Sequence, residues 1–206
     1  RSVETKHNGT MRLHRLFGRW KLKGHDGTEQ DTPYMDGLWR KVLQVAAERR
    51  PSVRRCLVLG VAMGSSFDMI RSRWPDVAIV GVDWEPALFA LGQELHVFRA
   101  NDRVRFIEGD ARAVVPALDG TFDLVLIDLF FGRKVADAVT DPGMQNAVAA
   151  RLASGGVVCV NYFDQPSVLD GWRSKLGEPE TVHYQGNRIA VFRRERDNRP
   201  QTTDKR

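Results

Sequence analysis

Short apolar runs alternate with amphipathic segments from Arg55 onward, and this alternation limits the possible folds more than any other feature of the chain. The runs are rich in Val, Ile and Leu and show little period-two alternation, as is typical of parallel strands covered on both faces. Strands separated by helices predict an α/β doubly wound sheet with right-handed crossovers. The runs read CLVLG, AIVGVD, VRFIEGD, FDLVLID and GVVCVN, and helix-like stretches cover 66–74, 86–99, 111–118, 142–152 and 167–176.

The two ends of the chain follow other patterns. Turn signals at Gly18 and at the Asp-Gly pair 26–27 lie between strand-like segments, which predicts one or two β-hairpins followed by a helix over 36–49. Near the other end, TVHYQGNRIAVFRR predicts a hairpin with its turn at QGN. We therefore expect β-hairpins and a linking helix over 1–50, an α/β domain over 51–193, and a charged, disordered tail over 194–206.

The positive charge of the chain is concentrated at its ends. The net charge is +5, to which residues 1–24 contribute +6 and residues 193–206 contribute +3, so the middle of the chain is acidic. The overall charge is therefore weak evidence for a nucleic-acid partner, and we expect none. No apolar run reaches the ~18 residues of a membrane span and no signal peptide is evident, so we expect a cytoplasmic protein with no membrane partner. Cys56 and Cys159 lie in apolar runs without metal-ligand spacing, which predicts buried free thiols and no metal site.

The first strand–helix turn, LGVAMGSS, has the small residues of a nucleotide-binding turn, and ligands of open α/β sheets bind beyond the carboxyl ends of the strands. A dinucleotide fingerprint would need small residues ending in glycine at 60, 62 and 65, and only Gly60 is a glycine there. A phosphate loop is excluded because no lysine follows. The pattern that remains is G-x-G-x-G, the S-adenosylmethionine turn. It contains Gly60, Ala62 and Gly64, with alanine in the middle position, where its methyl group demands room.

Carboxylates end three successive strands after this turn. Asp83 ends AIVGVD roughly 20 residues on, where an acid can accept hydrogen bonds from both ribose hydroxyls. Trp84 follows it and could lie against the face of an adenine. Asp110 follows the next strand, where it could accept from the adenine amino group, and Asp128 follows the fourth, at the mouth of the cleft. Each aspartate alone could be a helix cap, but the combination favours a cofactor that contains a nucleoside.

In these motifs the chain resembles the class I S-adenosylmethionine-dependent methyltransferase superfamily, and more narrowly its spermidine synthase-like branch. The resembling segments run in family order over 55–161 and read LVLGVAMGSS, IVGVDWEPAL, VRFIEGDARAVV, FDLVLIDLF and LASGGVVCVN. Before them, GHDGTEQ and PYMDGLW resemble the aminopropyltransferase β-hairpin domain. The resemblance implies a Rossmann-like sheet of seven strands after a small β-hairpin region. It also implies S-adenosylmethionine or decarboxylated S-adenosylmethionine as cofactor, and a homodimer.

The resemblance also implies roles for individual residues. Asp128 matches the carboxylate that acts as general base in polyamine synthases. Tyr34, Phe131 and Tyr162 are the expected acceptor-binding residues. The expected cofactor-binding residues are Gln30, Gly60, Ala62, Gly64, Asp83, Trp84, Asp110 and Ala111.

Departures from the family pattern change the expected acceptor. Polyamine synthases have D-x-x-D at the fourth strand, and here the second acid is replaced by Phe131, which follows Phe130; Met35 stands where the family often has His or Gln. A buried diamine would need that second carboxylate, because burying an unpaired charge is costly. We therefore predict methyl transfer to a more apolar small molecule by in-line displacement. Aminopropyl transfer to a polyamine is the alternative.

A non-catalytic nucleotide-binding or RNA-binding protein is a further alternative. Ala62 and Phe131 favour a loss of catalysis. Arg19, Lys21 and Lys23 could share one strand face, which suits a row of phosphates and equally suits the solvated face of an ordinary hairpin. The acidic residues expected to face the cofactor are all present, and this favours an enzyme.

Overall fold

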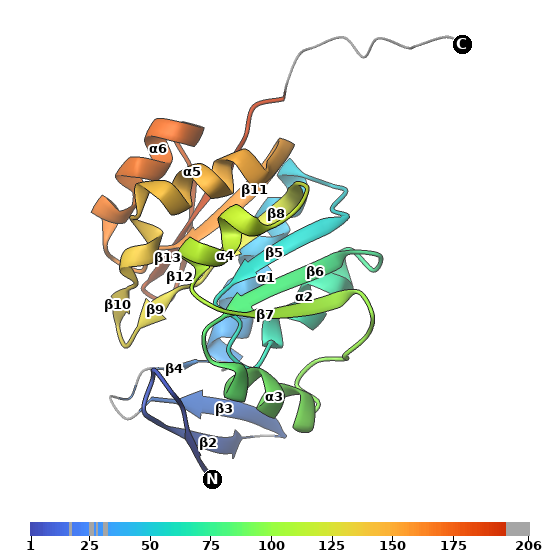
Figure 1. The fold of residues 1–206 in the computed structure, drawn as a ribbon, viewed down its shortest axis with the longest axis vertical. Helices are drawn as coiled ribbons and strands as arrows, with labels where there is room; N and C mark the ends of the chain where they lie inside the picture. Colours follow the sequence, from blue (N-terminus) through green and yellow to red (C-terminus); the bar gives the residue numbers. More distant parts are fainter. Residues whose placement is uncertain (17, 25–26, 28, 31–32, 197–206) are drawn as a thin grey trace.

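The structure is a computed structural model that describes residues 1–16, 18–24, 27, 29–30 and 33–196. Its centre is a seven-stranded sheet with the order β12-β13-β11-β8-β5-β6-β7 (Figure 1). All neighbouring strands pair in parallel except β13, which is antiparallel to both β11 and β12. The strands are β5 (Arg55–Leu59), β6 (Ala78–Asp83), β7 (Val104–Glu108), β8 (Phe122–Ile127), β11 (Leu152–Asn161), β12 (Glu180–Tyr184) and β13 (Asn187–Arg193). The predicted doubly wound sheet and the C-terminal hairpin are confirmed.

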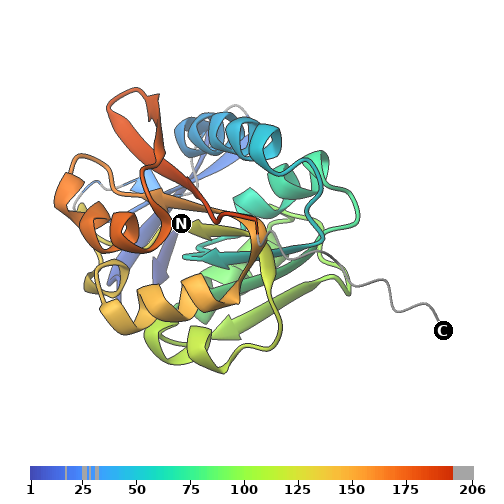
Figure 2. The same ribbon diagram turned by 90° about the horizontal axis from the view of Figure 1, so that it is seen from above.

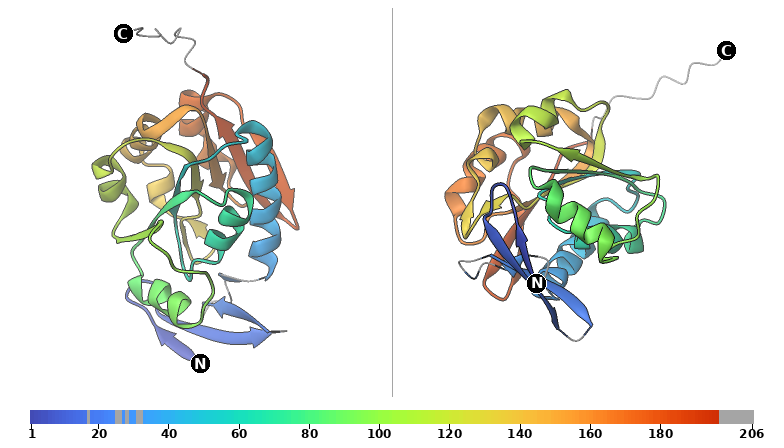
Figure 3. Two further views of the ribbon diagram at one scale, coloured as in Figure 1. Left: turned by 90° about the vertical axis from the view of Figure 1, so that its right-hand side faces the viewer. Right: turned by 60° about the horizontal axis from the view of Figure 1, so that its bottom comes forward.

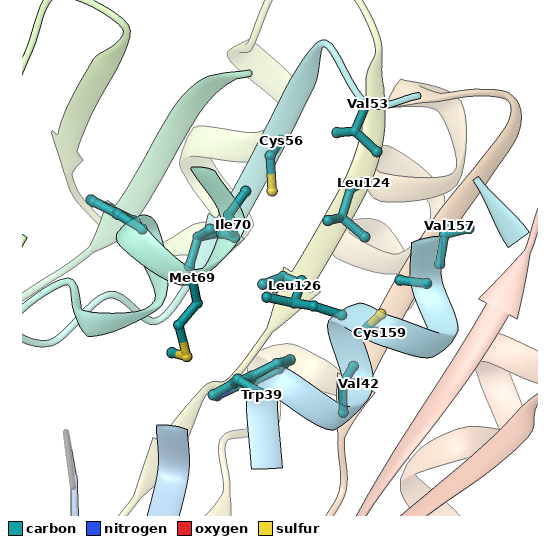
Figure 4. Packing of buried hydrophobic residues seen from close by; sticks show 14 of the residues in the cluster. Trp39, Val42, Val53, Cys56, Met69, Ile70, Leu124, Leu126, Val157 and Cys159 are labelled. Atoms are coloured by element: carbon teal, nitrogen blue, oxygen red, sulfur yellow. The ribbon is translucent and has the colours of Figure 1, made fainter. Parts of the chain in front are cut away.

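Helices cover both faces of this sheet (Figure 2). Successive residues of β5 point to opposite sides: Cys56 and Val58 belong to one buried cluster, and Leu57 and Leu59 belong to the other. The first cluster includes residues of α1 and α2, among them Trp39 packed between strands and helices (Figure 4). The second includes residues of α4, α5 and α6. The helices are α1 (Pro33–Arg49), α2 (Ser65–Arg73), α3 (Pro86–Glu94), α4 (Ala111–Ala117), α5 (Pro142–Arg151) and α6 (Asp170–Leu176).

A second, smaller sheet is built from the N-terminal segment. It is antiparallel in the order β1-β2-β3-β4, with β1 (Ser2–Glu4), β2 (Thr10–Leu16), β3 (Arg19–Lys23) and β4 (Glu29–Gln30). Three buried side chains of this sheet pack against Met63 and against α3, which lies directly above it (Figures 1 and 3). These are Met11, Leu13 and Leu22. The small sheet therefore lies beside the turn that follows β5.

Some predicted boundaries were wrong. The helix expected over 86–99 ends at Glu94, because the chain turns there and His96 takes a left-handed backbone with φ 51°. Strand β11 begins at Leu152, directly after α5, and is longer than the apolar run alone. A short hairpin, β9 (Phe130–Phe131) with β10 (Lys134–Val135), was not foreseen, and neither were two 3₁₀ turns at Asp137–Val139 and Pro166–Leu169. Most of the expected tail, 197–206, lies outside the described residues. Within the described part, no helix is long and apolar enough to span a bilayer.

Candidate active site

A pocket of about 760 Å³ opens at the carboxyl ends of β5, β6 and β8. Its walls come from the turn after β5, from the residues after β6 and β7, from the β9–β10 hairpin, and from the β1–β2 connection. This is the position at which open α/β sheets bind ligands. The predicted site residues that line it are Tyr34, Gly60, Ala62, Asp83, Trp84, Asp110, Ala111, Asp128 and Phe131.

The turn after β5 is held tightly against the end of β8. Gly60 has φ +88°, and a Cβ atom built on it would lie 2.2 Å from the carbonyl oxygen of Asp128. Ala62 has φ 48°, so the middle position of the turn also takes the left-handed conformation that favours glycine. Gly64 has φ +83° and does not line the pocket, because its Cβ position faces the ring of Phe98 at 2.8 Å. The prediction that Gly64 contacts a ligand stays a prediction, and in this structure the absence of a side chain leaves room for Phe98.

Asp83 connects this turn to the end of β6. One carboxylate oxygen accepts from the backbone N–H groups of Val61 and Ala62 at 2.7 and 3.0 Å, and the other accepts from the N–H of Glu85 at 3.0 Å. A carboxylate has about four acceptor positions, so one remains on the second oxygen. Burial raises the pKa of Asp83 above its ordinary value, against the opposing effect of the three N–H groups. Three of its acceptor positions are therefore used within the chain, and its bonds to ribose hydroxyls stay a prediction.

Glu85 is a buried carboxylate that the sequence analysis did not single out. It is 1% exposed and accepts hydrogen bonds from the backbone N–H groups of Lys6, His7 and Asn8, which form the turn between β1 and β2. The ring of His7 also stacks on Trp84, with ring centroids 4.7 Å apart. These contacts hold the β1–β2 turn at the pocket, and Asn8 of this turn is one of the lining residues. No sequence signal identifies Glu85, because its partners lie more than seventy positions away.

Asp110 caps α4 and also faces the pocket. Its side chain accepts from the backbone N–H of Arg112 at 2.8 Å and forms an ion pair with the Arg112 guanidinium at 2.5 Å. The hydrogen bond from Arg112 lowers the pKa of Asp110, so this carboxylate stays ionised. Asp110 therefore serves as the helix cap that the sequence analysis kept as its alternative. If Asp110 accepts a hydrogen bond from an adenine amino group, it must do so while its carboxylate is also bound by the Arg112 guanidinium.

Asp128 lies at the floor of the pocket with both carboxylate oxygens oriented by neighbours. The indole N–H of Trp39 donates to one oxygen at 3.1 Å, and the amide of Asn161 donates to the other at 2.8 Å. Asn161 is itself fixed, since its side-chain oxygen accepts from the N–H of Phe163 at 3.2 Å. Trp39 comes from α1 and Asn161 from the end of β11, so two elements distant in sequence hold this carboxylate in place.

The other predicted acceptor residues divide between the pocket and the core. The Tyr34 hydroxyl donates to the carbonyl oxygen of Tyr184 at 3.1 Å while its side chain lines the pocket. Phe131 lines the pocket and is 58% exposed. Tyr162 does not line it: its side chain is buried in the second core cluster, which contradicts the predicted contact with an acceptor. The backbone of Gln30 is in β4, and its side chain lies outside the described residues.

Neither a metal-ligating cluster nor an exposed thiol is found among the residues that the structure describes. Among the described residues, no group of three or more His, Cys, Asp or Glu side chains could hold a metal ion. Cys56 and Cys159 are buried and free, and burial raises the pKa of both thiols. The ionisable side chains that line the pocket among the described residues are four aspartates, two arginines, one lysine and Tyr34.

Comparison with known proteins identifies transferases as relatives. A demethylmenaquinone methyltransferase of Thermus thermophilus is 35% identical over 132 residues, which cover 64% of this chain and 56% of that protein. A polyamine aminopropyltransferase of Chromobacterium violaceum is 26% identical over 111 residues, covering 53% of this chain and 42% of that protein. The chain thus spans about half the length of the curated relatives it matches. No family model matches it.

The structural comparison shows the fold. A probable spermidine synthase of Corynebacterium glutamicum superposes with a TM-score of 0.75 at 16% identity, covering 94% of this chain and 79% of that one. The Rossmann-like fold of class I methyltransferases and spermidine synthases is therefore confirmed for this chain. The sequence relatives are likewise a methyltransferase and an aminopropyltransferase, consistent with the resemblance to the spermidine synthase-like branch of that superfamily.

Proposed function

We propose that this chain is a transferase that binds S-adenosylmethionine and moves its methyl group to an apolar small molecule. The observation that carries this proposal is the position of Asp83, whose carboxylate joins the left-handed turn after β5 to the end of β6 and which itself lines the pocket. The similarity to a methyltransferase at 35% identity supports the same reaction.

The residues in the pocket fit a nucleoside-containing donor. Its volume of about 760 Å³ is within the ordinary range for small-molecule sites. Asp83 would accept from a ribose hydroxyl, and Trp84 and Ala111 would enclose the adenine from two sides. Gly60 and Ala62 would lie along the methionyl part. Because His7 covers one face of Trp84, a stacked adenine would use another surface of that indole.

The donor supplies an activated methyl group on sulfur, so the chain itself must mainly align the acceptor and exclude water. We assign Asp128 the role of general base toward the acceptor. Trp39 and Asn161 orient its carboxylate, and such fixed orientation is what proton transfer from a bound acceptor requires.

Aminopropyl transfer to a polyamine is the second candidate. It is favoured by the structural match to the probable spermidine synthase. That match covers 94% of this chain, so it must include at least part of the N-terminal sheet. It is opposed by Phe131, which takes the position of the second acid and lines the pocket with Phe130 and Leu129. These side chains offer no charge partner to a diamine.

The RNA-binding alternative has less support. Arg19 of the basic hairpin forms an ion pair with Asp36 of α1, and Lys21 and Lys23 also have interaction partners. Much of this charge is therefore engaged within the protein. A cytoplasmic location and a homodimer rest on the sequence pattern and on the family resemblance, and sedimentation at micromolar concentration would test the dimer.

The experiment that tests the proposed function is calorimetric titration with S-adenosylmethionine, decarboxylated S-adenosylmethionine and NAD in parallel. We expect the intact sulfonium donor to bind most tightly and NAD not to bind. Tighter binding of the decarboxylated compound would replace methyl transfer by aminopropyl transfer. No binding of either sulfonium compound would show that Gly60–Gly64 is only a tight turn.

A further inference from the structure

Two of the cations that line the pocket are paired with carboxylates, and a third has no ion pair among the described residues. Arg112 is paired with Asp110, and Lys134 is paired with Asp137 at 2.9 Å. Arg133 occupies the tip of the β9–β10 hairpin, is exposed, lines the pocket and forms no ion pair with any residue that the structure describes. A ligand that reaches this tip therefore meets an arginine that forms no ion pair with a described residue.

Aromatic and apolar side chains line the same pocket, and three of them lie between Asp128 and Arg133 in the sequence. Phe131 is 58% exposed and is the one large hydrophobic side chain among the described residues that is classed as exposed. Phe130, Leu129 and Phe163 are partly buried and also line the pocket. An exposed phenyl ring at the mouth of a pocket is a surface on which a planar ligand can stack.

The hairpin that carries these groups is anchored at its base. Val135 is 3% exposed and packs into the second core cluster. The N–H of Ala136 donates to the carbonyl oxygen of Leu129 at 2.9 Å, and this bond joins the two ends of the hairpin. Phe131 and Arg133 therefore lie on a hairpin whose base is held by a backbone hydrogen bond and by the packing of Val135.

We propose that the acceptor is a planar aromatic compound that carries an acidic group, with its ring on Phe131 and its anion at Arg133. This assignment rests on the proposed function and names the substrate class for it. The reacting O–H or N–H group lies at the opposite end of the acceptor, toward Asp128. There the donor carbon–sulfur bond breaks, the methyl group joins the acceptor atom, and the proton leaves to the Asp128 carboxylate. A polyamine is disfavoured because its ammonium groups would be repelled by Arg133.

The test uses two fluorescent probes that share an aromatic skeleton and differ in charge. These are 1-anilinonaphthalene-8-sulfonate, which is anionic, and N-phenyl-1-naphthylamine, which is neutral. We expect Arg133→Gln to weaken binding of the anionic probe about threefold or more and to change the neutral probe by less than twofold, because only the first loses a charge partner. Phe131→Ala should weaken both probes. Arg105→Gln is the matched control, because Arg105 is exposed on β7 outside the pocket.

The outcomes separate this inference from the proposed function. If Arg133→Gln weakens both probes equally, or no more than Arg105→Gln does, the assignment of an acidic acceptor is overturned. The same holds if Phe131→Ala leaves both affinities unchanged, since the probes then bind elsewhere. Donor binding is measured on the wild-type chain with S-adenosylmethionine alone. Its failure would overturn the proposed function without bearing on how the pocket discriminates between the two probes.

Discussion

Gly60→Ala is expected to destabilise the fold by about 2–5 kcal/mol and to abolish donor binding. A Cβ atom at this position would lie 2.2 Å from the Asp128 carbonyl oxygen and 2.8 Å from the carbonyl carbon, and both are backbone atoms of the neighbouring strand end. The turn would have to separate from β8 to make room. Because the N–H groups of Val61 and Ala62 donate to the Asp83 carboxylate, that movement would also disturb Asp83, to which we assign binding of the methyl donor. Chemical denaturation and donor titration measure the two effects.

Gly186→Ala is the matched control for this substitution. Gly186 has φ +87°, almost the value at Gly60, but nothing lies within 4 Å of its Cβ position. This control therefore measures the strain of a left-handed alanine alone, about 1–2 kcal/mol. Equal losses of stability in the two variants would contradict the close contact between the turn and β8.

Asp128→Asn is expected to lower methyl transfer at least ~100-fold while donor affinity changes by less than about threefold. The substitution removes the proton acceptor. It also turns a carboxamide N–H₂ toward either Trp39 or Asn161, which both donate to the present carboxylate. Rates at saturating donor, compared with donor affinity from titration, separate loss of chemistry from loss of binding.

The control for Asp128→Asn is Asp102→Asn, since Asp102 is exposed and does not line the pocket. Its turnover should match that of the wild type. If Asp128→Asn also retains full turnover with donor still bound, Asp128 is not the base and only shapes the pocket floor.

The sequence was sufficient to predict the sheet and the acids at its edge. Parallel strands covered on both faces give continuous apolar runs, so β5, β6 and β8 were recognisable from these runs and the helix-like stretches between them. The residue that follows each strand then lies at a common edge, which is why Asp83 and Asp128 were expected in one pocket and are found there.

The contacts that give these acids their environment could not be predicted. Glu85 binds the turn of residues 6–8, and Asp128 binds Trp39 and Asn161, across sequence separations that no local pattern encodes. The predicted position of Tyr162 in the pocket also depended on contacts that no local pattern encodes. It follows the strand end closely, but the chain turns there and buries its ring in the core.

The single measurement that tests the proposed donor site most directly is calorimetric titration of S-adenosylmethionine into the wild-type chain and into Asp83→Asn, at neutral and at mildly acidic pH. We expect the wild type to bind and the variant to bind at least ~10-fold more weakly, because a charge-assisted hydrogen bond is lost. Burial raises the pKa of Asp83, so this residue takes up its proton at a higher pH than an ordinary aspartate. Wild-type affinity should therefore fall as the pH drops through that raised pKa, and the affinity of the variant should not. Equal affinity of the two proteins, or no binding by the wild type, would contradict a donor site at Asp83.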